Sequence, residues 1–418
     1  MDKRLRRWAT TRVIPLVAAA VLLVVGVNVG IEWNPLHGSM GFAGAFDVWR
    51  SYGVTDQILN GHLAQVYSTS SGLIGLPGAL LVLVPAVALS QSLHLSVGGS
   101  LSIVQAPTAW PVMELWVLLL SASVLFAADA LSRRLGVGSR RRWVLAALEV
   151  VVLWNVAFWY GHPEYPLALS FMLFAVVDAT DGRWARCGWL FGVAIALQPI
   201  VLAVVGVAFA FAPARRWLGL GARIVVAPLV VVVGPLIANW HEAFRTLHLQ
   251  PASLVRDHVT PWAHLAPRLS GASVSAAPLR SAATLLGFVL CVVVCRRRPS
   301  LVVVLASVAA ALVIRCLVDP VLVSYYVFPP LAVGLLVAAT AGRWRFAAVG
   351  VLATFVTVYA KAGPGGEWLW PIVVAGGSLA VVVIAWPRSG RRGAHVRRAA
   401  PVQSPGRPDP VSRAVGTP

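Results

Sequence analysis

Residues 12–31 of this chain read RVIPLVAAAVLLVVGVNVGI, an apolar run long enough to cross a lipid bilayer as one helix. Similar runs recur along the 418 residues, of which 58% are hydrophobic and only 12% are charged, with a mean hydropathy of +0.79. A soluble protein of this length needs a more charged surface. Because the runs are continuous and do not alternate, they predict helices. The sequence therefore predicts an all-α, polytopic membrane protein with one membrane domain over 12–387.

The formal net charge of +19 is concentrated in short arginine-rich clusters between the apolar runs and at the two ends of the chain. This distribution fits the rule that basic residues flank spans on the cytoplasmic side, so we do not expect nucleic acid as a partner. A basic tail (1–11) and a disordered tail rich in Arg, Pro, Ser and Gly (388–418) are both predicted to be cytoplasmic. The expected location is the cell membrane, with membrane lipids as partners of the arginine clusters.

Two stretches leave the number of crossings open. Residues 73–110 hold either two crossings, the second a weak one, or a re-entrant segment at 73–92 broken by prolines. Residues 187–212 have basic residues at both ends, which requires an even number of crossings. Two short helices that turn near Gln198-Pro199 fit this requirement, because proline breaks a helix.

Two large outer loops are expected, at about 32–72 and 241–279. The first carries Phe46-Asp47-Val48-Trp49-Arg50-Ser51-Tyr52, where an acid, an arginine and three aromatics lie near the membrane edge. Acids at such an edge are costly unless solvated or paired, so Asp47 is either functional or an ordinary solvated loop acid. If the stretch is helical, Arg50 lies one turn further on the same side, where it can hold a phosphate or form a salt bridge with Asp47 or Asp56.

Three further places on the outer side offer polar side chains. His162 and Glu164 lie in a proline-stiffened turn, where they can bind sugar hydroxyls or assist a leaving group; alternatively, Glu164 is a first-turn acid favoured by the helix dipole. Arg315 can contact a phosphate or pair with Asp319 one helical turn away. His258 lies in the second outer loop, within reach of such a site.

The pair Tyr325-Tyr326 is interpreted first as part of an interfacial aromatic belt and second as a binding element. No histidine pair has a tight metal-ligand spacing, and no Walker loop is present, so no cofactor is expected. A divalent ion held by one or two scattered acids stays open. An activated donor that arrives through the lipid is favoured over a cytosolic nucleotide.

Several short motifs, taken in order, resemble the GT-C superfamily of integral-membrane glycosyltransferases, in particular the branch of polyprenyl-phosphomannose-dependent mannosyltransferases. The resemblance covers about 12–345 and departs from the family at Gln198, where a lysine is usual. The matching positions are Asp47, Tyr52, Gly61 and Tyr67 after the first span, Gly161-His162, Gly188 and Gly192 before Gln198-Pro199, and Ser324-Tyr325-Tyr326.

The resemblance implies a GT-C-like helical bundle that moves a hexose such as mannose from a polyprenyl-phosphate donor to a cell-envelope glycolipid or glycan. Asp47 would be the general base that deprotonates the acceptor hydroxyl. Positive charge near the leaving phosphate would stabilise it. The expected substrate-binding residues are Arg50, Tyr52, His162, Glu164, His258, Arg315 and Tyr325.

Two other functional classes remain. The proline-broken segments suit a transporter or lipid flippase with discontinuous helices. Against it, we find no inverted repeat, and Glu114, Asp129 and Glu149 are expected toward helix ends rather than at mid-span. A non-catalytic membrane scaffold is the third interpretation, and it predicts no dependence on Asp47.

Overall fold

The structure, a computed structural model, describes residues 12–32, 46–68, 75–97, 108–254, 258–363, 366 and 368–388. This part of the chain is mostly helical with a few short strands, which confirms the predicted helical class. Among the described residues, six helical segments are long and apolar enough to cross a membrane. They are α6–α7 (Trp110–Ser121, Ser123–Arg134), α8 with η4 (Ser139–Val152, Asn155–Trp159), η6 with α12 (Ala214–Arg216, Trp217–Ala238), α14 (Ala277–Cys295), α15 (Leu301–Val318) and α17 (Arg343–Ala362).

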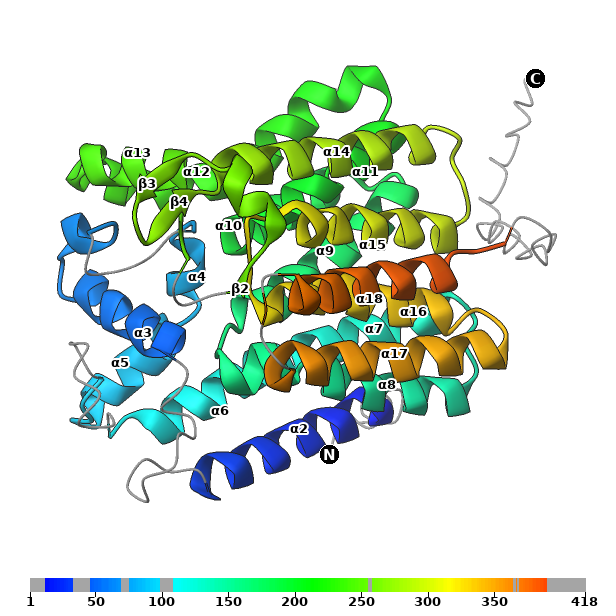
Figure 1. Cartoon of the computed structure of the whole chain (residues 1–418), viewed down its shortest axis with the longest axis horizontal. Helices are drawn as coiled ribbons and strands as arrows, with labels where there is room; N and C mark the ends of the chain where they lie inside the picture. The colour runs from blue at the N-terminus through cyan, green and yellow to red at the C-terminus, as the bar shows by residue number, and fades with distance from the viewer. Residues whose placement is uncertain are drawn as a thin grey trace, which may run out of the picture. The chain divides into compact units, whose positions relative to one another are not determined.

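Shorter apolar helices run beside these six, and successive helices run back and forth along one direction (Figure 1). The connections α7–α8, α14–α15 and α16–α17 gather at one end of the bundle, here called the basic end because Arg140–Arg142, Arg296–Arg298 and Arg343 lie in or beside them. The shorter helices are α2 (Val13–Glu32), α9 (Glu164–Thr180), α10 (Trp184–Leu197), η5 with α11 (Pro199–Val204, Gly206–Phe211), η8 with α16 (Ser324–Val327, Phe328–Ala338) and α18 (Leu369–Ala385).

Burial separates the central helices from the outer ones. Every residue of α16 is buried, as expected for a helix that is apolar all round and packed among others. By contrast, α12 exposes much of its apolar surface, including Leu218, Val230 and Ile237, which are 90%, 70% and 82% exposed. Apolar faces of this extent are unfavourable in water and are compatible with lipid.

The two ambiguous stretches have clear outcomes where they are described. In 73–110, α4 (Gly78–Leu81) and α5 (Val84–Ser92) are far too short to cross a bilayer core about 30 Å thick. The described part of this stretch therefore makes no crossing. In 187–212, α10 ends before Gln198, whose backbone is extended, and the chain turns back through η5 and α11. The predicted break at Gln198-Pro199 is confirmed.

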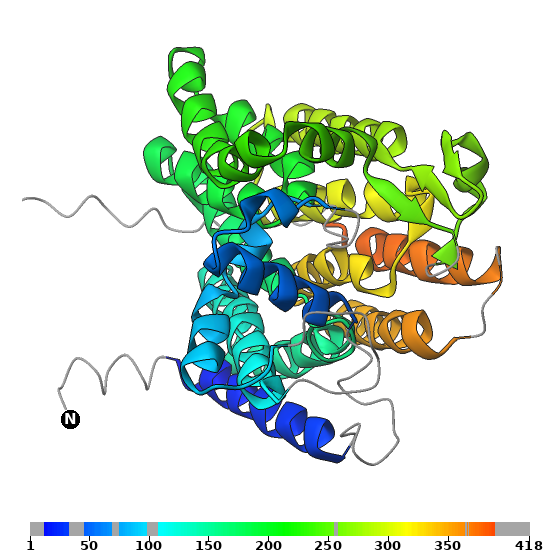
Figure 2. The same ribbon diagram turned by 90° about the vertical axis from the view of Figure 1, so that its left-hand side faces the viewer.

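The opposite end of the bundle, here called the α3 end, is covered by a layer of short elements. The helix α3 (Phe46–Leu59) lies across the ends of the bundle helices (Figure 2). It packs through Val48 and Tyr52 against Met113 of α6 and against α5. On the far side of this layer, η3 (Leu63–Gln65) and α13 (Trp240–Leu249) contact α12.

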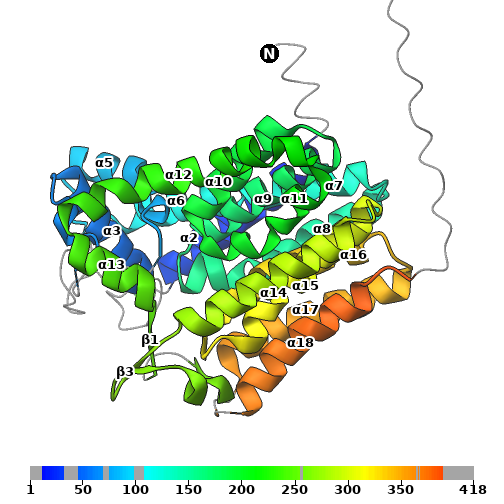
Figure 3. The same ribbon diagram turned by 90° about the horizontal axis from the view of Figure 1, so that it is seen from above.

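Small antiparallel sheets complete the α3 end (Figure 3). One has the order β1-β4-β3, with Pro251 opposite Ser275, and the other pairs β2 with β5, with His258 opposite Leu322. The second outer loop is thus largely structured, which its polar composition did not predict. The strands are β1 (Pro251–Ser253), β2 (His258–Val259), β3 (Arg268–Ser270), β4 (Ser273–Ser275) and β5 (Val321–Leu322), with η7 (Pro261–Leu265) between β2 and β3.

Candidate functional site

The turn between α8 and α9 places two polar side chains inside the bundle at the α3 end. The segment that begins with α8 ends in η4, which is π-helical. Gly161 follows it in the left-handed region, at φ +64°. Such a φ is uncommon for residues with a Cβ, so glycine suits this position. The amide of His162 then donates to the carbonyl oxygen of Val156 at 2.8 Å, and Pro163 precedes the first residue of α9, Glu164.

Glu164 is the buried centre of a partly buried hydrogen-bonded group. Its carboxylate oxygen Oε1 lies 2.7 Å from His162 Nδ1 and accepts a hydrogen bond from Gln198 Nε2 at 3.2 Å, while the residue is only 6% exposed. A carboxylate on Nδ1 holds the imidazole ring in one orientation and directs Nε2 away from it. Gln198 reaches Glu164 because α10 ends at the proline break. The side chain of Glu164 is therefore engaged with His162 and Gln198.

Aromatic rings cover this group. Tyr325 lies with its centroid 4.4 Å from that of His162 and 4.8 Å from that of Tyr160, whose hydroxyl accepts a hydrogen bond from Ser324 Oγ at 2.8 Å. Tyr325 and Tyr326 are 8% and 9% exposed. The interpretation of this pair as an interfacial belt is therefore wrong, because belt aromatics lie at the membrane surface. Instead the pair joins the His162 group to the next cluster.

That cluster consists of two arginines on one buried carboxylate. Asp319 is completely buried; its Oδ2 accepts from Arg280 Nε at 3.0 Å and from Arg315 Nε at 3.1 Å. Both guanidinium groups also lie near the ring of Tyr326, at 6.0 and 5.2 Å from its centroid. Nη1 and Nη2 of Arg315 form no hydrogen bond with a described residue. The cluster thus carries two positive charges and one negative charge. The Nη donors of Arg315 make it suitable for binding an anion.

Arg280 was missed by the sequence reasoning. It lies in the first turn of α14, on the side where the positive-inside rule disfavours basic residues. A basic residue on the outer side is unusual, and this could have drawn attention to Arg280 in the sequence. The predicted pairing of Arg315 with Asp319 is confirmed, and it does not exclude the phosphate role, since the pair uses only one nitrogen of Arg315.

The start of α3 rests directly on the turn that carries His162. A Cβ atom added to Gly161 would lie 2.6 Å from Cγ2 of Val48, so this close approach requires glycine. Asp47 is the second residue of α3, next to Val48, and its side chain lies outside the described residues. The stretch Phe46–Tyr52 is helical, which is the condition for Arg50 to lie one turn beyond Asp47. Arg50 is partly exposed and forms no ion pair with a described carboxylate.

Tyr52 and His258, which were also expected to bind substrate, make contacts outside the His162 group. Tyr52 is fully buried between α3 and α6, and its hydroxyl donates to the carbonyl oxygen of Met113 at 3.4 Å. Burial raises the pKa of this phenol well above its usual value, and no face of the ring is left for a substrate. His258 stacks on Trp370 with centroids 3.6 Å apart. Burial, and secondly the charge of Lys361, lower the pKa of His258, which favours the neutral ring.

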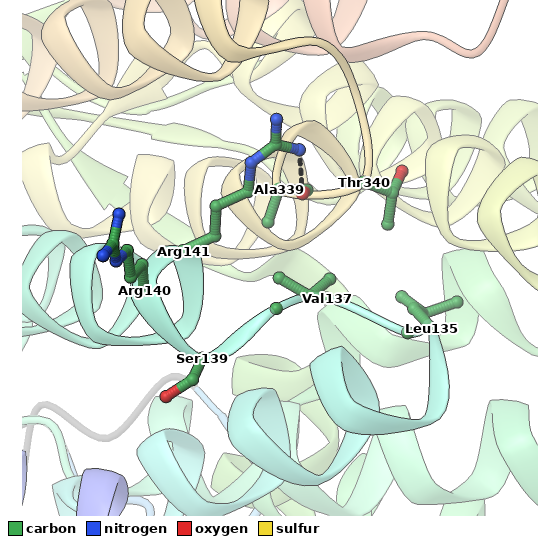
Figure 4. Close-up of a pocket in the computed structure, with 9 residues that line it drawn as sticks. Leu135, Val137, Ser139, Arg140, Arg141, Ala339 and Thr340 are labelled. Atoms are coloured by element: carbon green, nitrogen blue, oxygen red, sulfur yellow. Dashed lines mark hydrogen bonds between the residues drawn. The ribbon is translucent and has the colours of Figure 1, made fainter.

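A cavity of about 410 Å³ lies at the basic end, between the α7–α8 turn and the end of α16 (Figure 4). Arg141 projects across it and donates to the carbonyl oxygen of Ala341 at 2.6 Å. The described residues that line this cavity include no carboxylate or imidazole, the usual groups of acid–base chemistry. The lining residues are Leu135, Gly136, Val137, Gly138, Ser139, Arg140, Arg141, Ala339 and Thr340.

Within the described part of the chain, no group of three or more His, Cys, Asp or Glu side chains is arranged to hold a metal ion. The four cysteines are buried and unpaired. No protein-family model matches this chain, and a search of curated proteins finds no match.

Proposed function

We propose that this protein is a membrane glycosyltransferase that moves a hexose such as mannose from a polyprenyl phosphate to a cell-envelope glycolipid or glycan. The observation that carries the proposal is the convergence of distant motifs at the α3 end. The turn with His162 and Glu164, the break at Gln198 and the pair at Tyr325 meet in one partly buried group beneath the start of α3. His162, Gln198 and Tyr325 lie in three of the motifs on which the resemblance to GT-C enzymes depends, with Gln198 in the place of the usual lysine.

The charges suit the two halves of a glycosyl transfer. An acceptor hydroxyl attacks the anomeric carbon, a base takes its proton, and the bond to the phosphate oxygen breaks with both electrons leaving on the phosphate. Asp47 is the proposed base, since it lies in the first turn of the helix that rests on Gly161. Arg315, which shares Asp319 with Arg280, is the proposed partner of the leaving phosphate, because its Nη donors have no described protein partner.

His162 and Glu164 are proposed to bind the transferred sugar between these two charges. The dyad is held by Gln198 and by the ring of Tyr325, so its geometry is set before any substrate arrives. A fixed hydrogen-bonding group of this kind contributes to rate by positioning.

The proposed location is the cytoplasmic membrane, with the basic end inside and the α3 end outside. The arginine-rich connections at the basic end support this orientation. Exposed tryptophans at both ends of the bundle, such as Trp344 at the basic end and Trp240 and Trp368 at the α3 end, suit two membrane interfaces. The apolar outer face of α12 would then contact lipid.

The direct test replaces Asp47 with Asn and measures hexose transfer from a polyprenyl-phosphate donor in membranes. The matched control is Asp56→Asn on the same helix, because Asp56 already accepts a hydrogen bond from Gln91 at 2.7 Å and has a packing role. We expect transfer to be lost in the first variant and retained in the second, at equal expression. If Asp47→Asn transfers hexose as fast as the wild-type protein, Asp47 is not the base.

One observation favours a transporter as the second candidate. Glu149 lies in the last turn of α8, as expected, but at the midpoint of the longer apolar segment Ser139–Trp159, and it is 1% exposed. Its Oε2 has no hydrogen-bond partner among the described residues. Intramembrane acids often mark ion or proton pathways. Proton-dependent solute uptake in proteoliposomes that is abolished by Glu149→Gln, together with absent sugar transfer, would favour this candidate.

A further inference from the structure

One face of α13 carries a row of exposed aromatic rings, here called the aromatic row. Trp240, Phe244 and His248 follow one another at intervals of four residues, which places them on the same side of the helix. The ring of Phe244 lies between the other two, with its centroid 5.3 Å from that of Trp240 and 5.5 Å from that of His248. Trp240 and Phe244 are 62% and 50% exposed. The rings are therefore ordered against one another, while much of their surface is open.

The neighbouring side of α13 is packed on the protein. Ala243 is completely buried, and it belongs with Leu247 to an apolar cluster that includes Val54 of α3. The start of α13 is also fixed, because Asn239 Nδ2 donates to the carbonyl oxygen of Ala64 at 3.3 Å. Figure 3 shows α13 beside α3 in the layer of short elements at the α3 end. Any surface that holds the aromatic row would therefore also support α3.

The aromatic row continues the exposed apolar surface of α12. Ile237, which is 82% exposed, lies near the end of α12, and Asn239 is the one residue between the two helices. The backbone of Asn239 is not helical, so the chain turns there into α13. His241 and Arg245 are exposed on the side of the row that faces away from the packed side. Aromatic rings next to basic groups, at the end of a lipid-facing helix, suit the headgroup layer of a bilayer.

We propose that α13 lies along the bilayer surface at the α3 end, with the aromatic row inserted at the boundary between headgroups and acyl chains. The partner is the lipid surface itself, in the leaflet nearest the α3 end. This contact holds α13 in place and, through the shared apolar cluster, supports α3. The inference requires that α12 spans the membrane, and it does not depend on the proposed sugar transfer.

The test places an environment-sensitive dye on α13 of the full chain in lipid nanodiscs. All four native cysteines are buried, so a thiol-reactive dye attaches to a cysteine introduced at a more exposed position. His248→Cys places the dye at the end of the row and keeps the two larger rings. Thr246→Cys is the matched control on the opposite side of the same helix. Three quenchers are compared: a lipid with a nitroxide at the headgroup level, a lipid with a nitroxide at the chain end, and iodide in water.

We expect the dye on His248→Cys to be quenched most by the headgroup-level nitroxide and least by iodide, and the dye on Thr246→Cys to show the reverse order. Equal iodide quenching of the two dyes would overturn the inference. Protection of His248→Cys from iodide without quenching by either lipid would also overturn it, because protein, such as a second copy of this chain, would then cover the row. Strongest quenching by the chain-end nitroxide would contradict a position at the interface.

A second comparison, with the dye on His248→Cys throughout, tests whether the rings make the contact. Trp240→Ser with Phe244→Ser should lower quenching by the headgroup-level nitroxide and raise quenching by iodide, because membrane binding of an amphipathic helix scales with its buried apolar area. Trp344→Ser removes an exposed tryptophan at the basic end and should change neither. Unchanged quenching in the double variant would overturn the role of the rings. A wild-type chain that transfers no hexose would refute the proposed function alone, and the quenching would still decide the position of α13.

Discussion

Replacing Asp319 with Asn tests the two-arginine cluster on which the proposed phosphate site depends. The carboxylate is completely buried, and the side chains of Arg280 and Arg315 are 8% and 14% exposed. Breaking a buried ion pair from one side costs about 3–5 kcal/mol, because an uncompensated charge stays behind. Since Asn keeps one oxygen acceptor and solvent reaches part of Arg315, we expect a loss near the lower bound, about 3 kcal/mol.

The assay is thermal unfolding of the purified protein, followed with a thiol-reactive dye, since all four cysteines are buried when the chain is folded. Asp319→Asn should unfold at a clearly lower temperature than wild type. The double variant Asp319→Asn with Arg280→Met should recover part of the loss, because it removes one of the two stranded charges. A single variant as stable as wild type, or a double variant no more stable than the single one, would refute the reasoning.

Three further predictions concern single positions. Folding lowers the pKa of His258, so the imidazole binds a proton more readily in the unfolded chain than in the folded one. The free energy of unfolding should therefore fall as the pH drops through about 6.5. In His258→Phe this acid sensitivity should be smaller when unfolding is compared at pH 7.5 and 5.5; an unchanged pH dependence would contradict it. Gly161→Ala should cost more stability in thermal unfolding than Gly61→Ala, since both have positive φ but only Gly161 faces Val48; equal losses would contradict the close approach. Glu149→Gln should express and fold like wild type, whereas Glu149→Lys should not, because a cation at the midpoint of a span is costly; size-exclusion profiles decide this.

Features that depend on local sequence were predicted well. The helices follow from long apolar runs, and the end of α10 follows from Pro199, which lacks an amide hydrogen and clashes with the preceding turn. The helical geometry assumed for Asp47 and Arg50 is also present in α3. In each case a few neighbouring residues determine the backbone.

Features that depend on packing between distant elements were not predicted. Arg280 meets Asp319 across 39 positions of sequence, and only the packing of α14 on α15 brings the two side chains together. Tyr52 was expected to contact substrate, but its burial against Met113 depends on how α3 lies on α6. The depth of Tyr325 was equally hidden, because an aromatic pair near a helix start is also typical of a membrane interface.

The central claim is that the α3 end transfers a sugar from a polyprenyl phosphate. The most direct measurement uses the purified wild-type protein in lipid nanodiscs with a radiolabelled polyprenyl-phosphate hexose and a cell-envelope lipid extract as acceptor. We predict that labelled product and free polyprenyl phosphate appear in equal amounts, and that Arg315→Met reduces both by at least about tenfold through loss of a charged hydrogen bond. No release of polyprenyl phosphate by the wild-type protein with the complete extract, or undiminished release by Arg315→Met, would contradict the account.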